Sequence, residues 1–154
     1  MTAFAKSSST PLRSSDDRFF LASACCMAAV IFAGFSLQLG MGRSTFSSPL
    51  LVHAHAVVFM GWVLLFVLQS FFAATGRTGL HRSLGWIATA WMVAMLVLGC
   101  MVTVAMARRG HVPFFFRPLH FLIFDPGSLF TFAGLTTAAI IMRRKTEWHR
   151  RLHF

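Results

Sequence analysis

The chain has 154 residues, of which 56% are hydrophobic, 14% aromatic and only 12% charged. A soluble domain carries about 25% charged residues, so these figures exclude a disordered chain, a coiled coil and a small disulfide scaffold and point to lipid as the main solvent. The net charge of +10 is found in nucleic-acid-binding proteins, but here the basic residues lie between apolar runs, where they orient a membrane protein. No nucleic-acid partner is expected, and the predicted partner is the lipid bilayer.

The chain begins with a polar segment, 1–18, rich in Ser and Thr, which predicts a cytoplasmic tail without fixed structure. The first apolar run, 19–39, follows it. A cleaved signal peptide is the alternative interpretation of this run, but the run is longer than a typical signal-peptide core and shows no clear cleavage site. We therefore expect a retained membrane span.

Three further apolar runs predict three more spans, at 50–74, 84–106 and 119–142. Each of the four runs can cross a hydrocarbon core of about 30 Å as a helix. Because lipid offers the backbone no hydrogen bonds, spans of this length are expected to be helical. The predicted fold is an all-α integral membrane bundle with four transmembrane helices over 19–142, followed by a basic cytoplasmic tail, 143–154.

The Lys and Arg residues predict the orientation of this bundle. Ten of them lie on one face, in the N-terminal tail, the second loop and the C-terminal tail, and four lie on the other face: Arg43, Arg108, Arg109 and Arg117. Cytoplasmic segments carry an excess of Lys and Arg. The sequence therefore predicts a multi-pass protein of the bacterial inner membrane with both termini in the cytoplasm.

The seven histidines lie at span ends or in connections rather than in the middle of the membrane. In the predicted orientation they form an outer layer (His53, His55, His111 and His120) and an inner layer (His81, His149 and His153). Neutral imidazole is a ligand of haem iron and of metal ions. The alternative interpretation is that the histidines are interfacial residues that hydrogen-bond loops and headgroups.

Two b-type haem sites follow from the first interpretation. The outer site would pair His53 or His55 with His120, because residues 53 and 55 point about 200° apart around a helix and only one can face a given partner. The inner site would pair His81 with His149. Haem b is thus the predicted cofactor.

Asp125 is the one acidic residue inside a predicted span, and it directly precedes Pro126. A carboxylate within a membrane is costly and indicates a functional site with a partner. The candidate partners are Arg117 and an outer histidine. The alternative interpretation is structural, with Asp125 capping a helical segment that restarts at Pro126.

Four segments resemble a group of uncharacterised bacterial multi-pass membrane proteins: His53-Ala-His55 at the start of a span, Ala74-Thr-Gly-Arg77, Leu80-His81-Arg82-Ser83-Leu84-Gly85 and Trp148-His149-Arg150-Arg151-Leu152. The similarity covers residues 50–152, and Asp125 also fits it. The group is similar to the transmembrane b-type cytochromes in its layered histidines, which is an analogy of architecture. Its members continue beyond the last segment into further helices. The resemblance therefore implies a shortened member, or a bundle completed by a second copy or another membrane subunit.

These observations lead to two hypotheses. The first is a b-type haem-binding component that transfers electrons, an electron carrier rather than an enzyme, with no catalytic residues predicted. The alternative is a non-catalytic membrane subunit or a fragment of a proton or metal transporter that uses Asp125 and the outer histidines.

Overall fold

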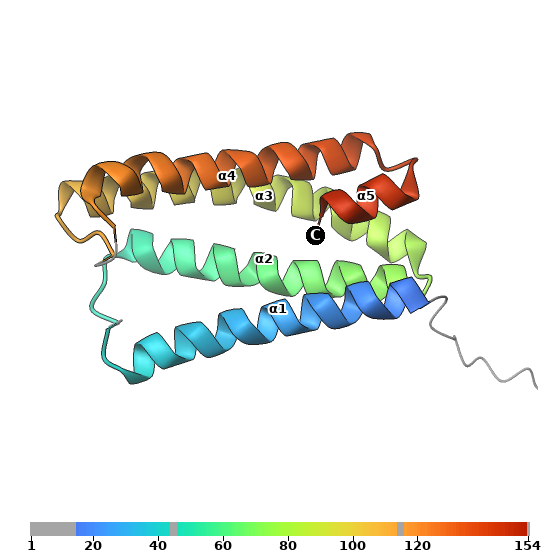
Figure 1. Cartoon of the computed structure of the whole chain (residues 1–154), viewed down its shortest axis with the longest axis horizontal. Coiled ribbons are helices and arrows are strands. Elements are labelled where there is room, and N and C mark those ends of the chain that lie inside the picture. Colours follow the sequence, from blue (N-terminus) through green and yellow to red (C-terminus); the bar gives the residue numbers. More distant parts are fainter. Residues whose placement is uncertain (1–14, 44–45, 114–115, 154) are drawn as a thin grey trace, which may run out of the picture. The chain divides into compact units, whose positions relative to one another are not determined.

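The computed structural model describes residues 15–43, 46–113 and 116–153. Within these ranges every regular element is a helix (Figure 1): α1 (Ser15–Gly40), α2 (Leu50–Ala74), α3 (Thr78–Arg108), α4 (Pro118–Ile141) and α5 (Thr146–Leu152). The predicted all-α fold is confirmed.

The first four helices have the dimensions of membrane spans. They contain 26, 25, 31 and 24 residues, so the shortest is about 36 Å long and exceeds the ~30 Å hydrocarbon core of a bilayer. All four are apolar enough to cross a membrane, and they expose large apolar side chains such as Phe35, Leu64, Val97 and Phe130. Exposing apolar surface to lipid costs little free energy, whereas exposing it to water is unfavourable. The four predicted spans are confirmed, and the protein is a multi-pass membrane protein.

The largest extensions of the helices beyond the predicted spans are at the starts of α1 and α3. Residues 15–18 of the predicted tail form the start of α1, where Asp16 and Asp17 occupy the first turn and their negative charge is favourable at a helix N-terminus. Residues 1–14 of that tail lie outside the described residues. α3 begins at Thr78 rather than at 84, so His81 and Arg82 lie within its first turns and not in the connection before it.

A common C-terminal motif ends α1, α2 and α3. A glycine with positive φ follows each helix: Gly42, Gly76 and Gly110, with φ of 68°, 71° and 68°. After α2, the N–H of Gly76 donates to the Ala73 carbonyl (3.2 Å) and that of Arg77 to the Phe72 carbonyl (2.9 Å). This is the Schellman motif, which satisfies carbonyls that a helix end would otherwise leave without partners. Because the turn is so short, α3 starts directly after it.

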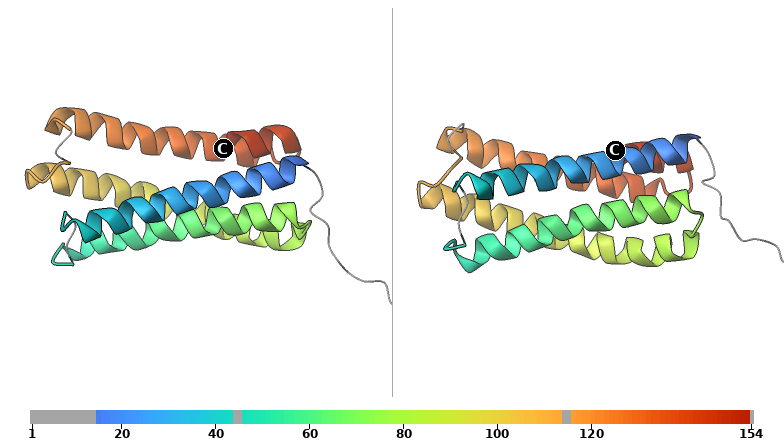
Figure 2. Two further views of the ribbon diagram at one scale, coloured as in Figure 1. Left: turned by 60° about the horizontal axis from the view of Figure 1, so that its bottom comes forward. Right: turned by 90° about the horizontal axis from the view of Figure 1, so that it is seen from below.

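The predicted basic tail, 143–154, contains the short helix α5. Both sets of views show α5 beside the C-terminal end of α4 (Figures 1 and 2). The Nδ1–H of His149 donates to the Ala139 carbonyl at 2.7 Å and ties the two helices together. An isolated helix of seven residues is unstable in water, so α5 depends on this packing, which the sequence pattern did not reveal.

The chain forms two compact units, and the boundaries between them fall inside α2 and α3. The first unit contains Met1–Ser47 and Met60–Thr89, and the second contains Ser48–Phe59 and Ala90–Phe154. In the first unit, α2 and α3 meet at Gln69. Its carbonyl oxygen lies 3.3 Å from His81 Nδ1, and its Nε2 lies 3.5 Å from the position that a Cβ on Gly85 would take.

In the second unit, α2, α3 and α4 meet at Gly99. A Cβ on Gly99 would lie 2.5 Å from Leu129 Cδ1 and 3.4 Å from Phe59 Cζ. Nearby, the indole N–H of Trp91 on α3 donates to the Val58 carbonyl on α2 at 2.8 Å. The missing side chain of Gly99 therefore lets the three helices approach closely, as small residues do in membrane bundles.

Candidate functional site

Asp125 lies inside a continuous helix. α4 begins at Pro118, with Arg117 in extended conformation before it, and runs through Pro126 without interruption. The interpretation of Asp125 as a cap for a helix that restarts at Pro126 is therefore wrong. The Asp125 side chain is half-buried, and a carboxylate at this depth requires polar partners from its own or neighbouring helices.

The hydrogen-bonding partner of Asp125 is Thr103 on α3. Thr103 is fully buried, and its Oγ1 lies within hydrogen-bonding distance of two oxygens, the Asp125 Oδ2 and, at 2.9 Å, the carbonyl oxygen of Gly99. A hydroxyl has one proton to donate, and a carbonyl oxygen can only accept. The hydroxyl therefore cannot donate to both oxygens at the same time.

This geometry gives the contact two hydrogen-bonding states. When Asp125 is ionised, Thr103 donates to the carboxylate, and the Gly99 carbonyl keeps only its helical backbone partner. When Asp125 is protonated, the carboxyl donates to the Thr103 oxygen, and Thr103 donates to the Gly99 carbonyl. Asp125 has a hydrogen bond with Thr103 in both states, which differ in the carboxyl proton and in the rotation of one hydroxyl.

His55 on α2 is the third member of this cluster. The negative charge of Asp125 acts on its imidazole, and the ring stacks on Phe59 with centroids 4.0 Å apart. Its Nδ1 is buried and has no hydrogen-bond partner among the residues that the structure describes. Asp125, Thr103 and His55 are called the Asp125 site below. Each comes from a different helix of the second unit.

The predicted outer residues differ in their surroundings. His53 and His55 are half-buried on α2, whereas His120 and Arg117 are exposed at the start of α4. Of the predicted outer histidines, His55 is the one on which the Asp125 charge is found to act. The pairing of His53 or His55 with His120 as haem ligands stays a prediction, and the Phe59 ring covers one face of the His55 imidazole.

The two residues of the predicted inner site, His81 and His149, each make a side-chain hydrogen bond to the backbone. His81 Nδ1 lies 3.3 Å from the Gln69 carbonyl, and His149 Nδ1 lies 2.7 Å from the Ala139 carbonyl. Because a carbonyl oxygen only accepts, both rings carry their proton on Nδ1, and the lone pair of the neutral ring is on Nε2. His81 belongs to the first unit and His149 to the second, so their pairing also stays a prediction.

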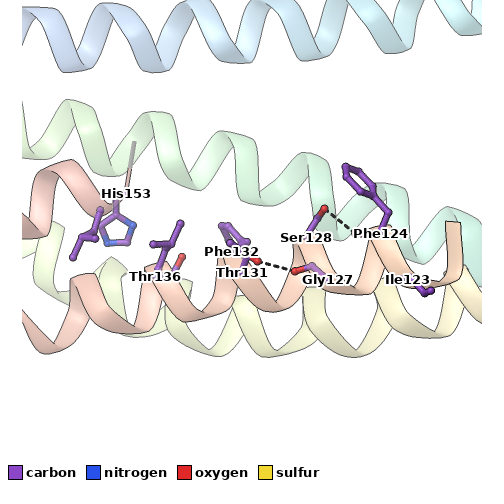
Figure 3. Close-up of a pocket in the computed structure, with 10 residues that line it drawn as sticks. Ile123, Phe124, Gly127, Ser128, Thr131, Phe132, Thr136 and His153 are labelled. Carbon is purple, nitrogen blue, oxygen red and sulfur yellow. Dashed lines mark hydrogen bonds between the residues drawn. The ribbon is translucent and has the colours of Figure 1, made fainter. Parts of the chain in front are cut away.

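An open groove of about 620 Å³ runs along α4 and ends at α5 (Figure 3). Its lining is mostly apolar, with hydroxyls from three residues and the imidazole of His153 at the α5 end: Ile123, Phe124, Gly127, Ser128, Thr131, Phe132, Leu135, Thr136, Leu152 and His153. Figure 3 shows the Ser128 and Thr131 hydroxyls bonded back to their own helix, to the carbonyls of Phe124 (2.8 Å) and Gly127 (2.9 Å). Asp125 does not line the groove.

Thr103 is the residue of the Asp125 site that the sequence analysis missed. A signal for it was present, because α3 and α4 are consecutive spans and Thr103 lies five residues before the end of α3 while Asp125 lies seven after the start of α4. The two residues are therefore at similar depth. No group of three or more His, Cys, Asp or Glu side chains arranged to hold a metal ion occurs in the described ranges.

The chain was compared with known proteins at three levels. No protein family, no curated protein and no solved structure matches it. The resemblance to multi-pass membrane proteins with layered histidines therefore stays a prediction, and the proposals below rest on the geometry of the chain itself.

Proposed function

We propose that the protein is a membrane component that takes up and releases a proton at the Asp125 site. The observation that carries this proposal is the single Thr103 hydroxyl between the Asp125 carboxyl and the Gly99 carbonyl. The site can hold Asp125 with or without its proton by turning one hydroxyl, with no movement of a helix. A carboxyl group that only stabilised the fold would need a single protonation state, either the ionised or the protonated one.

The surroundings of Asp125 support the same role. Ionisable residues inside membrane spans mark proton relays and ion pathways, and histidine is the side chain that most readily exchanges protons near neutral pH. His55 interacts with the Asp125 charge and offers a buried Nδ1 without a hydrogen-bond partner in the described part of the chain. The site therefore contains two ionisable groups in one compact unit, and the charge of one acts on the other.

Infrared difference spectroscopy across a pH titration tests this proposal directly. Wild-type protein in lipid should give carboxyl bands that appear on acidification. Asp125→Asn should remove one component of them, and Thr103→Val should shift that component by removing the hydrogen-bonding partner of Asp125. Glu147→Gln is the matched control, because Glu147 is an exposed acid on α5. Carboxyl bands that are unchanged in Asp125→Asn would contradict the proposal.

Transport is tested in liposomes that contain a pH-sensitive dye. With an imposed membrane potential, wild-type protein should carry protons faster than Asp125→Asn by about a hundredfold or more, in line with the effect of removing an acid–base group. His55→Phe keeps the ring contact with Phe59 and should slow the flux. Equal rates for wild type and Asp125→Asn would show that the carboxyl titrates without conducting.

A second candidate function, b-type haem binding with electron transfer, is favoured by the hydrogen bonds of His81 and His149. A carbonyl that accepts the Nδ1–H orients the ring and puts the lone pair of the neutral imidazole on Nε2, the arrangement typical of histidine ligands. Haem would be held by His81 and His149 at the predicted inner site and by His53 or His55 with His120 at the predicted outer site. When bound, it would supply one-electron chemistry. The chain's own contribution would be to fix the ring orientations through Gln69 and Ala139.

Reduced-minus-oxidised spectra of the purified protein test the haem candidate. His149→Ala and His81→Ala should each remove the absorbance of the inner haem. His111→Ala is the control, because His111 is exposed and its Nδ1 bonds only within its own turn, to Arg109. A preparation that stays colourless after haem addition would exclude this function while leaving the proton site intact.

The distribution of positive charge also supports a location and an orientation for the protein. We place the chain in a bacterial inner membrane with both termini in the cytoplasm, supported by the ten Lys and Arg residues on one face against four on the other. A second copy or another membrane subunit would cover the apolar surfaces that the four spans expose.

A further inference from the structure

The groove between α4 and α5 ends beside a dense group of positive charge. Five of the nine residues between 143 and 151 are basic, and they are called the basic segment here: Arg143, Arg144, Lys145, Arg150 and Arg151. One acid, Glu147, lies among them. Clusters of four to eight Lys and Arg directly after a transmembrane helix attract anionic lipid headgroups. The same charge opposes a metal cation at His149 and His153, although their spacing is suitable for one.

The depth of α5 places this charge at the membrane surface. α4 ends at Ile141, and the exposed Trp148 on α5 is a residue type concentrated at the membrane–water interface. The phosphates of phospholipids lie at this level. The basic segment is therefore positioned to meet a lipid headgroup, and the groove leads from it into the hydrocarbon region.

The length and the chemistry of the groove fit an acyl chain. Its α4 residues run from Ile123 to Thr136, about 20 Å along the helix, which exceeds half of a ~30 Å hydrocarbon core. The donors of Ser128 and Thr131 are used within α4, so the middle of the groove offers a ligand little besides apolar contact. A sugar or peptide would leave its polar groups unsatisfied there, whereas an acyl chain would not.

We propose that this groove and the basic segment together bind one anionic phospholipid, with its headgroup at the basic segment and one acyl chain along α4. His153 lines the α5 end of the groove and would contact the glycerol ester region. The site is separate from the Asp125 site, so the proposal goes beyond the proton role and does not depend on it.

Two variants test the two halves of the site. Gly127→Leu fills the groove, because a Cβ at Gly127 meets no atom within 4 Å and Gly127 lines the groove. Arg144→Gln/Arg151→Gln removes two exposed charges from the basic segment. The matched controls are Gly134→Leu, which has the same open space on α4 but lies outside the groove, and Arg108→Gln/Arg109→Gln at the other end of the spans. Circular dichroism checks that each variant retains its helix content.

The measurement is native mass spectrometry of protein extracted from vesicles that contain equal amounts of phosphatidylglycerol and phosphatidylcholine. Wild type and both controls should retain one phosphatidylglycerol in preference to phosphatidylcholine. The charge variant should lose about tenfold in that preference, and Gly127→Leu should lose the retained lipid. Equal retention of the two lipids by wild type would overturn the proposal. So would a Gly127→Leu protein that retains phosphatidylglycerol as wild type does, because the lipid would then be held by surface charge alone.

Discussion

At the scale of single residues, the Thr103 hydroxyl has one proton and two oxygen neighbours. Thr103 bonds both within its own helix and across to Asp125. Thr89 offers a natural comparison, because its hydroxyl also donates to the carbonyl of a glycine four residues earlier, Gly85, at 2.8 Å. Thr103 thus differs from Thr89 in its contact with a carboxyl group on another helix.

Replacing Thr103 with Val should therefore destabilise the fold more than the same change at Thr89. Thr103→Val leaves a half-buried carboxyl without its partner, and we expect a loss of about 1–2 kcal/mol in the free energy of unfolding. Thr89→Val removes a bond within one helix and should change it by less than about 0.5 kcal/mol. Reversible unfolding in mixed micelles measures both. Equal losses would show that the bond between Thr103 and Asp125 contributes nothing to stability.

At the scale of the helices, the close approach of α2, α3 and α4 depends on Gly99. Gly99→Ala would place a methyl group 2.5 Å from Leu129 Cδ1, so the Leu129 side chain or a helix would have to move. Overpacking of this kind costs about 1–3 kcal/mol, which exceeds the gain of about 1 kcal/mol from the higher helix propensity of Ala. We expect Gly99→Ala to lower the unfolding free energy.

Gly134→Ala on α4 is the control for that prediction. A Cβ there meets no atom within 4 Å, so the substitution should be neutral or stabilising. In a double-mutant cycle, Gly99→Ala and Leu129→Ala together should cost less than the sum of the single changes, because the smaller side chain relieves the overlap. Additive losses would show that overlap with the Leu129 side chain does not cause the destabilisation by Gly99→Ala.

At the scale of the whole molecule, an even number of spans puts both ends of the chain on the same side of the membrane. The distribution of Lys and Arg predicts that this side is the cytoplasm. Single cysteines test it in a background in which the free cysteines Cys25, Cys26 and Cys100 are replaced by Ser. A membrane-impermeant maleimide should label Arg109→Cys in intact cells and Arg144→Cys only after lysis. The reverse pattern would invert the orientation.

The sequence by itself determined the four spans. Hydropathy and length are properties of a local stretch of chain, and a bilayer requires any such stretch to be a helix because the backbone has no other hydrogen-bond partners there. The same local information indicated that Asp125 needs a partner. It could not identify that partner, because the rotation of one helix against another is set by packing at residues such as Gly99 and Leu129.

The tertiary structure decided the rest. It joined Asp125 to Thr103, which lies 22 residues earlier in the chain. It also showed α4 continuing through Pro126. The sequence did not predict α5, because its segment has the composition of a basic tail. The stability of α5 comes from its packing on α4 rather than from its own seven residues. These features depend on contacts between distant segments, which composition and periodicity do not encode.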